Sequence, residues 1–111
     1  MTEQQALELI LKHLEVSLAY RECELARFIE DGNTETFTRL KAIEILRNLD
    51  TSSPFVIVDQ IKNVRTEAKR DSSRFKQSAE DRKAYHHAVG MLVFASSELS
   101  TIEMFVDAID E

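Results

Sequence analysis

The sequence predicts an all-α protein, a small antiparallel bundle of three to four helices that self-associates. The 111-residue chain contains only two glycines and one proline, whereas all-β folds need turn-forming residues every ~8–12 positions. Leu, Glu, Ala, Lys, Arg and Ile dominate the composition, and most of these are good helix formers. Apolar residues also recur in alternating steps of three and four, which is the spacing of one helix face.

Length and composition indicate one soluble domain that spans residues 1–111. Apolar residues make up 43% and charged residues 31% of the chain, which is typical of a globular protein. Cys23 is the single cysteine, so a reducing, cytoplasmic location is expected. The N-terminus is acidic where a signal peptide would be basic, and no apolar run approaches the ~20 residues that span a bilayer. We therefore expect no contact with a membrane.

The first helix is predicted from Glu3 to Ile29. Its seam carries Leu7, Leu11, Leu14, Leu18, Arg21, Leu25 and Phe28, and Ala6, Ile10 and Ile29 widen the apolar stripe. Arg21 interrupts this seam, and an arginine in such a place is expected to reach the edge of the core or to pair with a carboxylate, here Glu98 or Glu103. Gly32 is expected to end the helix, because glycine adopts the left-handed capping conformation easily.

The second helix is predicted to begin at Asn33 or Thr34 and to end before the polar segment 50–53. Its apolar side carries Phe37, Leu40, Ile43 and Leu46, with Ala42, Ile45 and Leu49 beside them. The third helix is predicted to start at Pro54 with Ser53 as its N-cap, since proline is tolerated in the first helical position. The segment PFVIV would also suit a short strand, but no other segment offers a partner strand, so we favour a helix.

Past Val64 the third helix becomes polar, and its end is the least defined boundary. The sequence SAED, residues 78–81, resembles a capping box and predicts a fourth helix that starts near Ala79. The alternative is one continuous helix from Pro54 to Ile109, which would be about 84 Å long and would require a dimer. We favour a break between about Asp71 and Ser78.

The fourth helix has the clearest apolar pattern in the chain. An unbroken ladder follows the helical spacing: Ala88, Leu92, Ala95, Leu99, Ile102, Val106 and Ile109. Other apolar residues lie off this ladder, so the stretch 88–95 is apolar on nearly every side and should be buried all round. A bundle of this size has little room for such a helix. We therefore expect a homodimer, with an apolar interaction surface made by Met91, Phe94, Met104 and Phe105.

The charges are unevenly distributed along the chain. The net charge is −6, which disfavours a general nucleic-acid binder. Residues 54–87 nevertheless hold eight Lys or Arg against five Asp or Glu, and this basic middle lies between acidic ends. A solvated charged face explains the run most simply. Its functional alternative is a docking surface for an acidic protein or for RNA, and Lys69, Arg70 and Arg74 are its candidate residues.

Arg82 and His87 form an R-x4-H pattern. In a small helical domain this pattern resembles the motif of the HEPN superfamily, whose ribonuclease members use such a pair at a dimer interface. The resemblance implies a metal-independent ribonuclease, with His87 in proton transfer or positioning and Arg82 against the phosphate charge. The competing interpretation, which we favour, is a pair of solvated side chains on the first turns of the fourth helix.

No sequence motif for a cofactor, a metal or a nucleotide is present. The chain has no Cys-x-x-Cys, His-Glu-x-x-His or Glu-x-x-His pattern and no Gly-rich phosphate loop. We therefore expect a protein without cofactor that acts by binding a protein partner through its helix faces, as an adaptor, regulator or inhibitor. The alternatives are the HEPN-like ribonuclease and a nucleic-acid-binding subunit of a larger complex.

Overall fold

The computed structural model describes residues 1–27, 34–76 and 81–109, and these ranges contain four α-helices and no strand. The helices are α1 (Glu3–Ala26), α2 (Thr34–Arg47), α3 (Pro54–Phe75) and α4 (Arg82–Asp107). The prediction of an all-α helical bundle is thereby confirmed. The helix favoured for PFVIV is also correct, and α3 ends within the predicted break, so α3 and α4 are separate helices.

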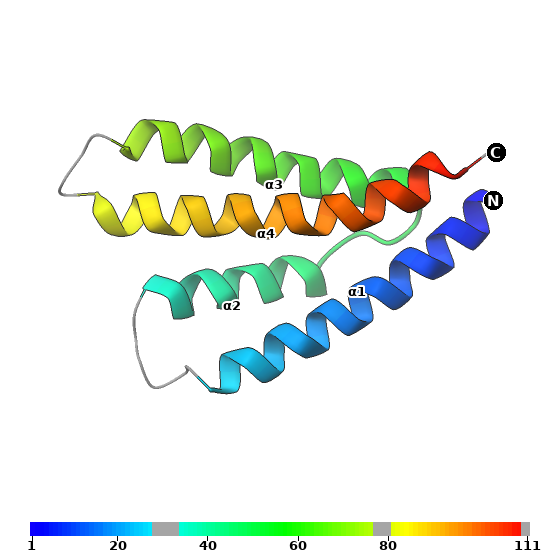
Figure 1. Ribbon diagram of the computed structural model, residues 1–111, viewed down its shortest axis with the longest axis horizontal. Coiled ribbons are helices and arrows are strands. Elements are labelled where there is room, and N and C mark those ends of the chain that lie inside the picture. The colour runs from blue at the N-terminus through cyan, green and yellow to red at the C-terminus, as the bar shows by residue number, and fades with distance from the viewer. Residues whose placement is uncertain (28–33, 77–80, 110–111) are drawn as a thin grey trace.

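The four helices form a thin, elongated molecule with dimensions of 49 × 30 × 18 Å. In Figure 1, α3 and α4 lie side by side along most of their length, and α2 lies on the other side of α4. The chain continues this layer with α1, which packs against α2, α4 and α3. Because α4 lies between α3 and α2 and also contacts α1, it is the central element of the fold.

One hydrophobic cluster receives side chains from all four helices. Its buried members are Ile10, Leu14, Ala42, Leu46, Ile57, Val58, Ile61, Ala68, Met91, Phe94, Ala95, Leu99 and Ile102. Burial of apolar surface on this scale is the main favourable term in folding a domain of this size. The predicted ladder of the fourth helix supplies much of the cluster, with Ala95, Leu99 and Ile102 at most 1% exposed.

The helix starts follow local capping chemistry. Ser53 is the N-cap of α3, and its hydroxyl oxygen accepts a hydrogen bond from the Phe55 N–H at 3.1 Å, with Pro54 in the first turn. Thr2 and Gln5 form a reciprocal capping box at the start of α1. Both arrangements satisfy backbone N–H groups that have no partner within the helix.

Two predicted helix boundaries lie outside the described residues. The structure describes α1 up to Ala26, where the Arg27 N–H donates to the Glu24 carbonyl at 3.1 Å, and the predicted end at Ile29 is not described. It describes α4 from Arg82, and the predicted start near Ala79 is likewise not described. The expected caps at Gly32 and Ser78 lie outside the described residues.

The buried face of α1 is rotated relative to the predicted seam. Ala6 and Ile10, expected only to widen the stripe, are fully buried, and Leu14 is buried with them. Leu11 is 37% exposed instead. The line 6–10–14 therefore forms the buried side of α1, while Leu7 and Leu18 of the predicted seam are only partly buried against the core.

The apolar side of α2 is shorter than predicted. Ala42, Ile43 and Leu46 are buried, but Phe37 is 59% and Leu40 is 47% exposed. Both residues belong to the first half of α2, on a side against which no other described helix packs closely. Phe37 instead stacks obliquely on the His87 ring of α4, with ring centroids 4.8 Å apart.

The chain itself covers most of the apolar surface of α4. Met91 and Phe94, predicted as an interaction surface, are buried core residues, and Phe105 packs partly buried against the core. Met104 is exposed, as is Val93. The prediction for Met91 and Phe94 is corrected because helices on both sides of α4 enclose residues that the sequence alone leaves without neighbours.

Among the described helices, α4 is also long and apolar enough to cross a membrane by length and composition. The core helix of a globular protein passes the same test, and 33% of the apolar window of α4 is buried within the fold. The expectation of no membrane contact therefore stays a prediction.

Candidate functional site

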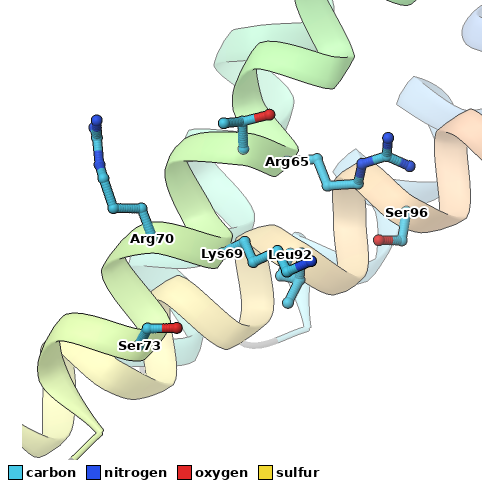
Figure 2. A pocket seen from close by; sticks show the side chains of 7 residues that line it. Arg65, Lys69, Arg70, Ser73, Leu92 and Ser96 are labelled. Atoms are coloured by element: carbon cyan, nitrogen blue, oxygen red, sulfur yellow. The ribbon is translucent and has the colours of Figure 1, made fainter.

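An open groove with a volume of about 760 Å³ runs between α3 and α4. Seven residues line it, five from α3 and two from α4: Arg65, Thr66, Lys69, Arg70, Ser73, Leu92 and Ser96. Figure 2 shows Arg65 and Lys69 extending from α3 toward α4, whereas Arg70 points away. The groove therefore presents two cationic side chains above a floor that α4 supplies.

Helical spacing brings these residues into line. Arg65, Lys69 and Ser73 are four residues apart, so they recur about once per turn along the edge of α3 that borders α4. Between them Ala68 is 5% exposed, and its small side chain allows α3 to pack closely on α4. Leu92 and Ser96, also four apart, repeat the pattern on α4. The line of cations is thus a direct consequence of the packing of α3 on α4.

The lining of the groove contains no carboxylate. Arg70 has Glu67 at 4.0 Å, a distant pair on the same helix. Within the described part of the chain, neither Arg65 nor Lys69 makes an ion pair. Two adjacent cations without a counter-charge create a positive potential, and a groove concentrates such a field. The site is therefore suited to an anionic ligand.

A second groove, between α1, α2 and α4, is different in kind. It has a volume of about 350 Å³ and contains both arginines and glutamates. Arg39 lies 3.0 Å from Glu24 and 2.9 Å from Glu35. These cations are neutralised within the protein, so this groove offers little net charge to a ligand.

Two of the three basic residues predicted as a contact surface belong to the basic groove. Lys69 and Arg70 line it, whereas Arg74 lies outside the lining and places its guanidinium over the Phe75 ring, 5.2 Å from the centroid. Sequence reasoning did not select Arg65 as a site residue. The four-residue spacing of Arg65 and Lys69 was the available signal, but only the packing shows that this edge of α3 borders a groove.

The structure does not bring Arg82 and His87 together within one chain. Both belong to α4, where residues five apart point about 140° away from each other. Arg82 is exposed. His87 turns toward α2, where its Nδ1 lies 2.7 Å from Thr38 Oγ1. A site that uses both side chains would need a second chain.

The environment of His87 favours its neutral form. Partial burial lowers the pKa of His87 below the ordinary value of 6.5, and the charge of Lys41 lowers it further, while Asp71 acts in the opposite direction. A neutral imidazole that hydrogen-bonds a threonine suits a packing role between two helices.

The most buried charged side chain among the described residues is Glu98 of α4, which is 2% exposed. Its carboxylate receives three side chains from one face of α1: His13 Nε2 at 2.8 Å, Arg21 Nη2 at 3.2 Å, and the Ser17 hydroxyl. Of the two carboxylates proposed as partners of Arg21, Glu98 and Glu103, the structure shows the ion pair with Glu98. Ser17 and His13 both contact the Glu98 carboxylate, and among the described residues no hydrogen bond joins them to each other as a nucleophile–base pair, so the cluster has the character of a structural ion pair.

No group of three or more His, Cys, Asp or Glu side chains that could hold a metal ion occurs in the part of the chain that the structure describes. Cys23 is exposed. Comparison of the chain with known protein families, curated proteins and solved structures found no match. The chemistry of the basic groove is therefore the basis for assigning a function.

Proposed function

We propose that the protein is a small helical protein-interaction module that binds an acidic segment of a partner protein in the groove between α3 and α4. The observation that carries this proposal is the lining of the groove, which holds Arg65, Lys69 and Arg70 and no carboxylate. A module of this kind acts as an adaptor, regulator or inhibitor and needs no cofactor. The exposed thiol of Cys23 is compatible with a reducing, cytosolic setting.

An acidic protein suits the groove better than a nucleic acid does. Binding of single-stranded nucleic acid draws on aromatic side chains that stack with bases, and no aromatic residue lines the groove. The protein has a net charge of −6 and therefore repels the negatively charged phosphates of a nucleic acid. A short acidic segment carries less charge and can reach the local positive field of the groove.

Fluorescence anisotropy with a labelled polyglutamate peptide and a labelled single-stranded RNA tests the proposal. The full-length protein should bind the peptide more tightly than the RNA, with an affinity that falls as salt is added. Lys69→Glu should weaken peptide binding by about tenfold or more, since it replaces an attractive charge with a repulsive one.

Lys12→Glu is the matched control, because Lys12 is an exposed residue of α1 and lies outside the groove. It makes the same change in net charge and should leave the affinity nearly unchanged. Equal losses in the two variants would reduce the effect to net charge and contradict the groove as the site. Tighter binding of RNA than of peptide would replace the acidic protein with a nucleic acid.

A further inference from the structure

We infer that the occupant of the basic groove is an acidic amphipathic helix of a partner protein, laid lengthwise along α3 and α4. This inference rests on the proposed function and adds the conformation and the charge spacing of the partner segment. Three observations support it: the line of the cations, the floor of the groove, and the ion pair beside it.

The cations of the groove are spaced as the carboxylates of a helix are spaced. Arg65 and Lys69 are one turn apart on α3, a separation of about 6 Å along the helix axis. Two glutamates at positions i and i+4 of a partner helix have the same axial separation. A partner helix parallel or antiparallel to α3 can therefore place one carboxylate opposite each cation. Alternate residues of an extended segment lie about 6.6 Å apart on one face, so the charge spacing permits either conformation, and the shape of the groove favours the helix.

The floor of the groove suits a helix. Two helices packed side by side leave a furrow, and a third helix packs into such a furrow at an interaxial distance of about 8–10 Å. Leu92 provides an apolar contact in the floor, and Ser96, one turn further along α4, is small enough for close approach. An occupant with one apolar residue between two acidic ones would match both features.

An ion pair lies beside the groove and limits where an acidic ligand can extend. Lys62, three residues before Arg65 on α3, has Glu103 of α4 at 3.8 Å. Because Glu103 compensates the charge of Lys62, this pair offers no attraction to further acidic residues in that direction. The acidic pair of the partner should therefore lie over Arg65 and Lys69, and the partner residue nearest Glu103 should be neutral or basic.

Two labelled alanine-based peptides of identical composition test the inference. The aligned peptide carries Glu at i and i+4 with Leu at i+3, so that all three share a face. The shuffled peptide distributes the same residues around the helix. The full-length protein should bind the aligned peptide at least about tenfold more tightly in fluorescence anisotropy, and circular dichroism should show a gain of helix on mixing.

A charge exchange locates the contact. Lys69→Glu should bind the aligned peptide at least about tenfold more weakly. A peptide in which one of the two glutamates is replaced by lysine should regain affinity for this variant and not for Lys12→Glu. Because Lys69 is exposed, the variant should fold as the wild type does, and its circular dichroism spectrum verifies this.

The outcomes distinguish the inference of a helical occupant from the proposed binding of an acidic segment. Equal affinity for the aligned and shuffled peptides, or binding without a gain of helix, would overturn the helical occupant and leave the acidic-segment function in place. Failure of both peptides and of polyglutamate to bind would overturn the proposed function itself. Light scattering of the protein alone tests for a second copy of the chain in the groove. A dimer that Lys69→Glu dissociates would identify that copy as the occupant and overturn the inference of a separate partner protein.

Discussion

Arg21 of α1 and Glu98 of α4 form an ion pair across the bundle, with Nη2 and Oε1 3.2 Å apart. The carboxylate is buried, while Arg21 keeps part of its side chain in solvent and lies over the Phe94 ring, 4.8 Å from its centroid. The side chains that contact the Glu98 carboxylate are His13, Ser17 and Arg21, and all belong to α1. The pair therefore fixes the register of α1 against the central helix.

Removal of the Glu98 carboxylate should destabilise the protein strongly. Glu98→Ala leaves a cavity and withdraws the acceptor from His13, Ser17 and Arg21, so we expect a loss of about 3 kcal/mol in the free energy of unfolding, measured by urea denaturation. Glu103→Ala is the matched control on the same helix. Its ion pair with Lys62 is partly exposed, so its loss should stay below about 1 kcal/mol. Equal losses would mean that the buried cluster contributes no more than a surface pair.

Gly90→Ala should destabilise the protein although alanine is the better helix former. A Cβ at Gly90 would lie 2.7 Å from Thr38 Cγ2, and rotation of Thr38 to relieve that contact would break its hydrogen bond to His87, which is worth about 1 kcal/mol. This loss and the strain oppose a propensity gain of about 1 kcal/mol.

The double variant Thr38→Ser/Gly90→Ala tests the cause. Serine retains the hydroxyl and lacks the methyl group, so the double variant should be more stable than Gly90→Ala alone in urea denaturation. If Thr38→Ser lowers the free energy of unfolding by the same amount in the wild type and in Gly90→Ala, a steric contact between residues 38 and 90 would be contradicted.

His87 should make the stability of the protein depend on pH. Its pKa is below 6.5 in the folded state because of burial and Lys41, so the unfolded state binds more protons as the pH falls through 6.5 toward the folded pKa. The stabilisation is present above the unfolded pKa and is lost in that window.

Thermal unfolding from about pH 8 to about pH 5 measures this effect. The melting temperature of the wild type should fall more than that of His87→Gln. His86→Gln is the control, because His86 is the exposed neighbour, and it should follow the wild type. Parallel curves for the wild type and His87→Gln would contradict a neutral His87 in the folded protein.

The protein should not cleave RNA under metal-free conditions. Arg82 and His87 diverge on one helix, and His87 is engaged by Thr38, so one chain does not assemble the pair. Incubation of mixed single-stranded RNA with concentrated protein, analysed by gel electrophoresis, is the measurement. Cleavage that disappears in His87→Ala would establish the ribonuclease instead, and light scattering would then be expected to show a dimer.

Local features of the sequence were sufficient for the secondary structure. Ser53 and Pro54 define the start of α3 by chemistry that acts within one turn, and the ladder from Ala88 to Ile102 marks the core side of α4. Pairing with Glu98 was one of the outcomes expected for Arg21, but the sequence did not distinguish Glu98 from Glu103.

The candidate site was predictable only in part. Lys69 and Arg70 were identifiable as part of a basic run, but the same run included Arg74, which lies outside the groove. Arg65 was missed, because the sequence does not state which edge of α3 borders α4. Met91 and Phe94 were assigned to a surface for the same reason.

The sequence by itself determined the helical class and the capped start of α3, and it required Arg21 either to reach the edge of the core or to pair with a carboxylate. These properties depend on contacts within a turn or on the cost of an uncompensated charge. The tertiary structure alone decided which helix faces meet: the rotation of α1 toward Ala6 and Ile10, the burial of Met91 and Phe94, and the alignment of Arg65 with Lys69 above Leu92. Periodicity shows which residues share a face, whereas the packing of helices from distant parts of the chain decides what that face contacts.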